Sequence, residues 1–470
     1  VVGGRHPLGV EPGGNALGAG AGPGSRAAGL GALAVLSDER LLQVFGALDP
    51  RALGRLACVS RAFCVLCNVE DIWRARVVSE FGGRFSFQPG GWKCTYLEAR
   101  FPGRFPPATS PSSQILRRGA PFYSDLLYQP HFCARLDLPP EWLEVENIER
   151  VPGSLSREAF VARFEGPNRP CVLTGVARRW PAFGKWDRAF LQRAFAGQTV
   201  HAGGFEFAPE DYFKYADLTQ DEQPFYLFDK EFVRKAPGLL ADFWPPECFG
   251  EDLFAHLGEE ARPDYRWLIA GPARSGSFFH KDPNATSAWN AVVSGSKKWV
   301  LFPPEVAPPG VHASADGADV ATSVSLAEWF LNFYAEARAS EEPPLECVVR
   351  AGEVIFVPSG WWHLVLNVED SVAVTQNFCS RANLRRVESA LRRPQLVSGC
   401  PEEARGTLHA RFLAALRKEC PAAAAELPPP AGGVAAGGAA PPLSALFASA
   451  GRSRSGFSFD FPDPAPPRPP

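Results

Sequence analysis

Apolar residues recur at helical spacing in the first strongly patterned stretch of the chain, residues 34–75. Ser37 fits an N-cap ahead of the first repeat, and Asp49-Pro50 ends one helix and starts another. The apolar positions that share this spacing are Leu41, Leu42, Phe45, Leu48, Leu53, Leu56, Phe63 and Leu66. We predict three short helices that cap the next domain or, because their apolar residues exceed what a small bundle can bury, dock on a partner.

The pattern changes to short apolar runs between Gly and Pro turns over residues 141–390. Runs such as 170–175, 264–271 and 353–357 have the length and composition of buried strands. Helical periodicity in the first stretch and strand-like runs in the longer second one predict an α+β protein that is mainly β. Many short strands separated by turns fit a double-stranded β-helix, a jelly-roll barrel of the cupin type.

The remaining segments differ in composition and set the expected domain boundaries. The two ends are rich in Gly, Ala and Pro and poor in large apolar groups, so we expect both to be disordered. The predicted order is a disordered segment (1–33), the helical module (34–80), an irregular aromatic connector (81–140), the barrel domain (141–390), C-terminal helices (391–420) and a disordered tail (421–470).

Two helical segments have surfaces whose role the pattern leaves open. Residues 325–337 have helical spacing and lie inside an insertion, residues 304–350. We favour a surface segment that packs on its own domain over a lid or a dimer surface. The C-terminal helices carry a row of basic residues, namely Arg385, Arg386, Arg392, Arg393, Arg405, Arg411 and Arg417. For this row we favour a solvated helix face, and the alternative is a contact with RNA or an acidic peptide.

Composition indicates the kind of cellular compartment in which the protein works. The chain has 470 residues and a formal net charge of −3, and no apolar run approaches the ~20 residues that span a bilayer. Its 11 Cys are an odd number without a paired framework, which favours a reducing compartment, nuclear and/or cytoplasmic. Cys64 and Cys67 lack a second pair, so we expect packing rather than a zinc site. The chain has no Met and begins at Val1, so any targeting segment upstream stays open.

Candidate metal chemistry is concentrated in three residues. His280 and Asp282 are two positions apart, so on a strand both side chains point to one face. His363 follows the turn at 358–360, which ends another strand-like run. If the two strands are neighbours, the three side chains meet as the two-His, one-carboxylate set of non-heme Fe(II) oxygenases. The alternative is a chance pair of surface polar residues, but two of the 8 His stand in apolar strand contexts, where a polar group without a partner is costly.

Lys297 begins an apolar run that reads as a buried strand entered from a Gly turn. Such a lysine is usually solvated, and the alternative is an ammonium paired with a carboxylate inside a barrel. Lys297 and Trp299 share one face of this strand and Lys298 takes the other. Two adjacent lysines cannot both point inward, so we expect one of them to be exposed.

The blocks HKDPNATSAWN, GSKKW and PSGWWHLVLN followed by TQNF resemble the JmjC family, in order and at similar spacing, over about residues 140–390. The resemblance is to its subgroup of phosphatidylserine-receptor-like protein lysyl hydroxylases, which use Fe(II) and 2-oxoglutarate. It implies that His280, Asp282 and His363 are the iron ligands and catalytic centre.

The same resemblance implies a co-substrate pocket. Lys297 and Thr375 match the partners of the distal 2-oxoglutarate carboxylate, and Asn290 and Ser277 match further pocket groups. The family commonly has Thr at the Ser277 position, so the hydroxyl is kept. Tyr212 matches the helix tyrosine that reaches this carboxylate, with Tyr215 one turn away as the alternative.

The helical module resembles an F-box through a leading Leu, the run LLQVFGALDPRALGRLACVSRAF and a following Trp. The Pro that usually follows the first Leu is absent, because Leu36 is followed by Ser37-Asp38. The resemblance implies docking on the Skp adaptor of a cullin ubiquitin ligase.

Together these resemblances predict an Fe(II)- and 2-oxoglutarate-dependent dioxygenase that acts on a protein, most simply by lysine hydroxylation, and is linked to a ubiquitin ligase. Arginine or lysine demethylation starts from the same C–H step and stays an alternative. So do a non-enzymatic F-box substrate adaptor and a zinc-loaded cupin. A homodimer is compatible with the C-terminal helices, no membrane partner is expected, and nucleic-acid binding stays open.

Overall fold

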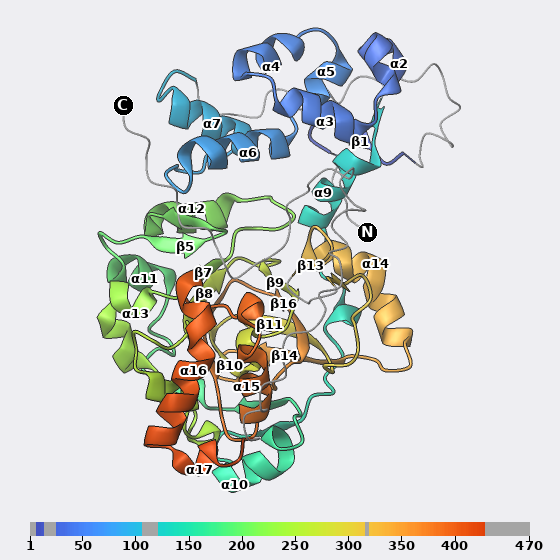
Figure 1. Cartoon of the computed structure of the whole chain (residues 1–470). Helices are drawn as coiled ribbons and strands as arrows, with labels where there is room; N and C mark the ends of the chain where they lie inside the picture. The colour runs from blue at the N-terminus through green and yellow to red at the C-terminus, as the bar shows by residue number, and fades with distance from the viewer. Residues whose placement is uncertain (1–5, 14–24, 106–120, 315–318, 428–470) are drawn as a thin grey trace.

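Two modules lie one above the other in the computed structural model (Figure 1). The structure describes residues 6–13, 25–105, 121–314 and 319–427. A helical module is at the top of the view, and a β-rich module surrounded by helices lies below it. No helix in this described part is both long and apolar enough to cross a membrane.

The upper module confirms the three predicted helices and the predicted starts of the first two. Ser37 accepts a hydrogen bond from the Arg40 N–H at the start of the first helix, and Asp49 caps the second, which begins at Pro50. Ser60 caps the third. A fourth helix contains the Trp that follows the predicted three. The four are α3 (Asp38–Gly46), α4 (Pro50–Leu56), α5 (Arg61–Leu66) and α6 (Glu70–Phe81).

The expected disorder of residues 1–33 is wrong for 6–13 and 25–33. The ordered elements there are β1 (Val10–Glu11), which pairs in parallel with β2 (Phe122–Tyr123), α2 (Ser25–Leu30) and η1 (Gly31–Val35). Val10 and Leu30 are buried, because residues far away in sequence supply the apolar surface that their own segments lack.

The tail expected to be disordered begins with a short helix, α17 (Pro421–Ala424), in which Ala423 is buried. The rest of that expectation, residues 428–470, lies outside the described residues.

The connector is more regular than its composition suggests, and it joins the two modules. It contains α7 (Trp92–Arg100) and α9 (Asp125–Arg135). Trp92 is buried, its Nε1 donates to Asp221 Oδ1 at 2.7 Å, and its ring lies 5.8 Å from that of Phe225. The helical module therefore packs on the barrel through aromatic contacts and a partly buried hydrogen bond.

Two facing sheets form the barrel, as the jelly-roll prediction requires. The larger sheet has the spatial order β3 (Arg150–Pro152), β4 (Cys171–Thr174), β15 (Val354–Val357), β10 (Ser287–Ser294), β17 (Ser371–Phe378), β8 (Arg266–Gly271), β7 (Leu227–Asp229), β5 (Val200–Ala202) and β6 (Phe205–Phe207). The smaller sheet has the order β14 (Leu345–Arg350), β11 (Ser296–Phe302), β16 (Trp362–Asn367) and β9 (Gly276–His280). A separate pair is β12 (His312–Ala313) and β13 (Val320–Ala321).

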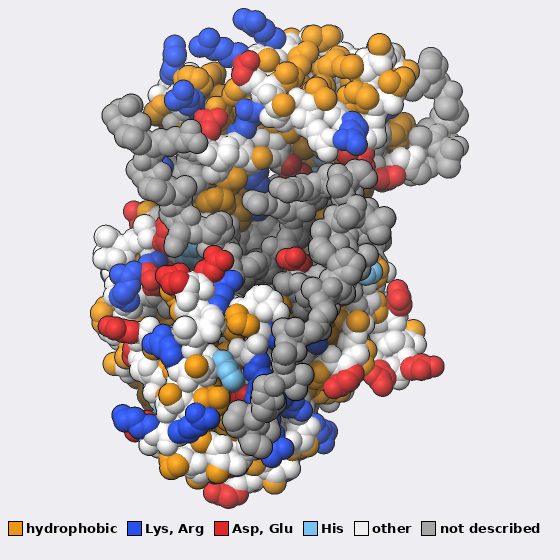
Figure 2. Space-filling view, viewed as in Figure 1, with side chains coloured by type: hydrophobic (Ala, Val, Ile, Leu, Met, Phe, Trp, Pro, Cys, Tyr) orange, Lys and Arg blue, Asp and Glu red, His pale blue; other side chains and the backbone are white. Residues whose placement is uncertain are grey.

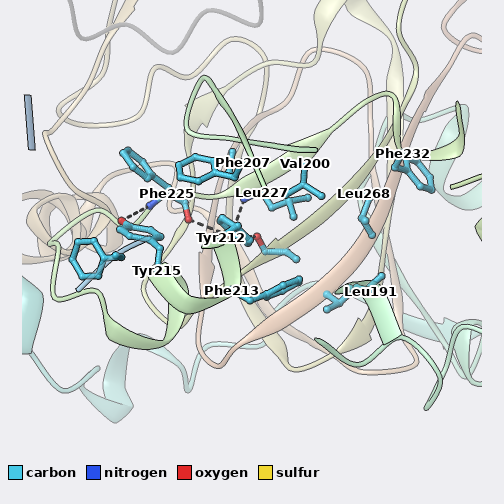
Figure 3. Close-up of a cluster of buried hydrophobic side chains, with 14 of the residues drawn as sticks. Leu191, Val200, Phe207, Tyr212, Phe213, Tyr215, Phe225, Leu227, Phe232 and Leu268 are labelled. Carbon is cyan, nitrogen blue, oxygen red and sulfur yellow. Dashed lines mark hydrogen bonds between the residues drawn. The ribbon is translucent and has the colours of Figure 1, made fainter. Parts of the chain in front are cut away.

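Helices cover the outside of these sheets (Figure 1). They are α10 (Arg157–Phe160), α11 (Arg188–Ala194), α12 (Pro209–Leu218), α13 (Phe232–Lys235), α14 (Leu326–Ala339), α15 (Leu384–Leu391) and α16 (Glu402–Glu419). Short helical turns are η2 (Pro140–Trp142), η3 (Val161–Glu165), η4 (Ala177–Arg179), η5 (Pro237–Asp242), η6 (Glu247–Phe249), η7 (Leu253–Leu257), η8 (Pro283–Ala285) and η9 (Pro394–Leu396). Figure 3 shows the cluster of buried hydrophobic side chains where α12 packs against β5 to β8.

The two helical segments whose surfaces were left open form three helices that pack on the rest of the chain. α14 buries Trp329 and Phe330 against Trp142 in one cluster, which agrees with a surface segment that packs on its own domain. α15 and α16 form another cluster with η7, whose buried members include Leu384, Val387, Leu391, Leu408, Phe412 and Leu416. The apolar face of the C-terminal helices is thus covered by this chain itself.

Candidate metal centre and co-substrate pocket

Antiparallel pairing of β16 with β9 brings the two predicted histidines together. His363 lies directly opposite His280 in the register, and their ring centroids are 4.1 Å apart. Asp282 is not on the strand, because β9 ends at His280 and Asp282 is the residue before η8. The turn nevertheless directs its carboxylate inward, and the potential donor atoms of all three residues lie within 4.8 Å of one another.

Burial decides the charge of these three groups in the absence of a cation. It lowers the pKa of both His280 and His363 to about 4, so both imidazoles are neutral at pH 7. Burial also raises the pKa of Asp282 to about 6. Neutral imidazoles and a carboxylate are the protonation states in which a metal ion is bound, and a cation among them offsets the cost of the buried carboxylate.

The hydrogen bonds around the triad agree with a metal site. His280 Nδ1 is 2.7 Å from the Phe278 carbonyl oxygen, and His363 Nδ1 is 3.1 Å from that of Trp361. Such contacts fix a ring so that Nε2 carries the lone pair. Asp282 Oδ1 accepts from Asn377 at 3.3 Å, whereas its buried Oδ2 has no hydrogen-bond partner among the described residues.

A buried oxygen left without a donor is expensive, and a cation satisfies it. The three side chains therefore fit Fe(II), with two nitrogen ligands and one oxygen ligand on one side of the ion.

The triad lies in a cavity between the two sheets. Three other predicted residues line the same cavity, and a fourth, Lys297, contacts Tyr226, which also lines it; the four come from four strands. They are Ser277 on β9, Asn290 on β10, Lys297 on β11 and Thr375 on β17. Ser277, Asn290 and Thr375 line the cavity directly, and Asn290 is paired in register with Thr375.

Lys297 has the environment expected of a carboxylate-binding lysine. It is fully buried, and its Nζ donates to Tyr226 Oη and Asn367 Oδ1, both at 2.8 Å. No carboxylate pairs with it among the described residues, and burial lowers its pKa to about 7. An anionic ligand that reached this ammonium would gain a charge-assisted hydrogen bond away from water.

Tyr212 is not in this cavity, which corrects its prediction as a co-substrate residue. Its hydroxyl donates to the Ala270 carbonyl oxygen at 2.8 Å and accepts from the Leu227 N–H at 3.1 Å (Figure 3). Tyr215, the alternative, donates instead to Asp221 at 2.8 Å. The tyrosine that lines the cavity and contacts Lys297 is Tyr226.

Sequence reasoning missed Tyr226 because it lies on a loop after α12, where no spacing argument applies. The one local signal was an aromatic pair, Phe225-Tyr226, at the start of a short strand.

The expectation that one of the adjacent lysines is exposed is also wrong. Lys298 is as buried as Lys297, on the opposite face of β11. There its Nζ lies 2.7 Å from Glu346 Oε2, and Glu346 also accepts hydrogen bonds from Tyr334 and Arg338. Both faces of the strand are covered, one by the barrel interior and the other by α14, so each lysine is buried for a different reason.

The fold and the site define a jelly-roll protein with a facial set of metal donors and an attached helical module. Comparison with known proteins agrees on both parts. Residues 156–383 match the Cupin-like domain family, and residues 38–79 match the F-box-like family.

Three relatives show how far the likeness extends. The arginine-specific demethylase JMJ22 of Arabidopsis thaliana is 47% identical over 425 residues, which cover 89% of this chain and 82% of that protein. The bifunctional arginine demethylase and lysyl-hydroxylase psr-1 of Caenorhabditis elegans is 36% identical, over 55% of this chain and 66% of its own length. The human 2-oxoglutarate and iron-dependent oxygenase JMJD4 is 34% identical, over 50% of this chain and 61% of its own length.

The chain thus belongs to the JmjC family of cupin-like, 2-oxoglutarate- and iron-dependent oxygenases, and it carries an F-box-like domain.

Proposed function

We propose that this enzyme oxidises a side chain of a protein substrate, and that His280, Asp282 and His363 hold its Fe(II). The observation that carries the proposal is the convergence of three potential metal donors on one cavity, together with the fully buried Lys297, which has no carboxylate partner among the described residues. Fe(II) held by these three residues would supply the chemistry that couples oxidative decarboxylation of 2-oxoglutarate by dioxygen to oxidation of a C–H bond, with succinate, carbon dioxide and a hydroxylated carbon as products.

The chain's own residues bind and orient in this proposal. Lys297 and Thr375 receive the distal carboxylate of 2-oxoglutarate, and Tyr226 and Asn367 hold the lysine ammonium in place. The Thr375 hydroxyl donates its single hydrogen to the Trp289 carbonyl oxygen at 2.9 Å, and this hydrogen turns to the ligand carboxylate, which only accepts, when the co-substrate binds. The apolar lining, which includes Trp299 and Val365, excludes water from the reacting centre.

Two outcomes of the same C–H oxidation are candidates. Lysine hydroxylation keeps the new hydroxyl, whereas oxidation of an N-methyl group on arginine gives a hydroxymethyl group that departs as formaldehyde. The relative psr-1 is named for both activities. JMJ22, which matches this chain over both modules, is named for arginine demethylation.

The first experiment measures succinate release from 2-oxoglutarate by the purified chain with Fe(II) and ascorbate, beside His280→Ala. Mass spectrometry of peptides that contain lysine or methylarginine then separates the outcomes. Gain of an oxygen atom supports hydroxylation, and loss of a methyl group with formaldehyde release supports demethylation. Failure of the native chain to bind metal or turn over 2-oxoglutarate with these peptides contradicts the proposal.

We further propose that the F-box-like domain binds a Skp adaptor and so joins the oxygenase to a cullin ubiquitin ligase. Four of the ten exposed large hydrophobic residues in the described part lie within residues 33–59, namely Leu33, Val35, Val44 and Val59. Hydrophobic side chains gather over this upper module in Figure 2. An apolar patch on such small helices fits a partner groove. Capture of a purified Skp adaptor by the native chain tests this, and no capture contradicts it.

We also propose a nuclear and/or cytoplasmic location. None of the 11 cysteines, all of which lie in the described residues, forms a disulfide, and most of them are buried, as in proteins of a reducing compartment. Microscopy of the tagged chain tests the location, and secretion of the chain contradicts it.

A further inference from the structure

The loop that carries Asp282 has an uncommon backbone conformation. Asn284 and Ala285, two and three residues further on, both have a φ of 55°, in the left-handed region. Alanine rarely adopts this conformation, because its Cβ approaches the backbone too closely. A loop of this kind keeps its shape only where surrounding structure holds it.

One hold on this loop comes from a segment more than 100 residues further along the chain. The Asn284 side chain is buried, with 7% of its surface exposed. Its Nδ2 donates to the Ser398 carbonyl oxygen at 3.0 Å, and its Oδ1 accepts from the Ser398 N–H at 3.2 Å. This two-point clasp satisfies the amide of one residue with the backbone of another 114 positions away.

The partner segment is itself fixed. Val397, directly before Ser398, is buried in the cluster of α15 and α16. The Gly399 carbonyl oxygen, directly after it, accepts from the Asp264 N–H at 2.6 Å. On its other side the metal loop is held by Ser359, whose Oγ donates to the Ala285 carbonyl oxygen at 2.6 Å.

We propose that Asn284 is a positioning residue for the metal centre: by clasping Ser398 it fixes the turn that aims Asp282 at the two histidines. The C-terminal helices thereby become part of the support of the metal site. The inference rests on the proposed function, because it takes Asp282 as a metal ligand. Residues that hydrogen-bond a ligand directly, as Asn377 does Asp282, typically control metal affinity by about 10- to 100-fold, and Asn284 acts on the same ligand through the turn.

The test is the affinity of the full chain for Mn²⁺ alone, measured by titration calorimetry with Asn284→Gly and Ser398→Ala. Glycine adopts a positive φ freely, so Asn284→Gly removes the clasp and leaves the backbone conformation accessible. Ser398 uses only its backbone in the clasp, so Ser398→Ala is the matched control. We expect a dissociation constant about 10- to 100-fold higher for Asn284→Gly and an unchanged one for Ser398→Ala.

The readout separates positioning from general stability. If Asn284 only stabilised the fold, Asn284→Gly would lower the melting temperature while folded protein kept native Mn²⁺ affinity, and that result overturns the inference. Equal weakening by Ser398→Ala also overturns it. If Asn284→Gly does not fold, Ser359→Ala loosens the same loop from the other side, and a several-fold weaker affinity is expected. A native chain that binds no Mn²⁺ instead rejects the metal site of the proposed function.

Discussion

The interior of the barrel and the surface of the F-box-like module reverse the usual distribution of side chains. Inside the barrel, Lys297 is fully buried and His363 is 4% exposed. On the upper module, Val35 is 87% and Val59 is 65% exposed. Each arrangement is costly in the isolated chain, because polar groups lose water inside the barrel and apolar groups face it outside.

The difference between the two regions indicates what each one binds. Inside the barrel, binding of a metal ion stabilises the donor side chains, and binding of an anionic co-substrate stabilises the Lys297 ammonium. On the upper module, an apolar protein surface that covers the exposed apolar side chains removes them from water and so stabilises the complex. The two regions should therefore respond independently to substitution, although Trp92 and Asp221 join the modules.

The largest expected effect is removal of a metal donor. Asp282→Ala takes away a ligand, and ligand loss should exceed the 10- to 100-fold effect typical of residues behind a ligand. We expect Mn²⁺ affinity and succinate release to fall by more than about 100-fold. Capture of the Skp adaptor should be unchanged, because the module surface is untouched. Loss of both properties together would show that the two regions are not independent.

The second-largest expected effect is a difference in stability between variants of the two adjacent lysines, measured by thermal unfolding. Lys298→Met should lower stability by about 3 kcal/mol, because it leaves the buried Glu346 carboxylate with fewer partners. Lys297→Met should cost less than Lys298→Met: it removes the donor to Asn367, but it breaks no ion pair among the described residues and it relieves a desolvation penalty. It should nevertheless abolish 2-oxoglutarate binding. A larger stability loss for Lys297→Met would contradict this assignment of the two faces.

A charge on the exposed face of the upper module should weaken adaptor binding. We expect Val44→Glu, at a side chain that is 48% exposed, to cost about 2 kcal/mol, or roughly 30-fold in affinity for the Skp adaptor. Val324→Glu, at another exposed valine on the barrel module, is the matched control and should change nothing. Equal effects of the two substitutions would show that the exposed patch is not the docking surface.

The smallest effect is the pH dependence of 2-oxoglutarate affinity. Burial lowers the pKa of Lys297 to about 7 in the free enzyme, and the ligand carboxylate favours the protonated form. Affinity should therefore be constant below pH 7 and fall as pH rises above it, by at most about tenfold per unit. Lys297→Arg should flatten this fall, since guanidinium stays charged. Calorimetric titration over this pH range measures both, and a flat native profile would contradict the assignment.

The sequence predicted more of the metal site than of its surroundings. His280, Asp282 and His363 were identified from their residue types, strand context and family resemblance, and strand pairing then brought them together. Tyr226 was missed and Tyr212 chosen instead, because only the packing of α12 decides which tyrosine faces the barrel interior. Local periodicity has no information about that choice.

Two other predictions were wrong for a related reason: that the N-terminal residues are disordered, and that one of the two adjacent lysines is exposed. Val10 and Leu30 stand in segments too poor in apolar residues to form a core of their own, and Lys298 stands beside another buried lysine. In each case the compensating surface or charge comes from residues far away in the chain, such as Glu346.

The sequence by itself determined the two modules, the helix starts and the donor set, because caps, turns and alternation depend on neighbours within a few positions. The tertiary structure alone decided which tyrosine contacts Lys297, where the second lysine finds its carboxylate and how Asn284 is clasped. These depend on contacts between distant segments, such as the one that spans 114 positions from Asn284 to Ser398. Burial and electrostatic pairing act through space, so the position of a residue along the chain does not reveal them.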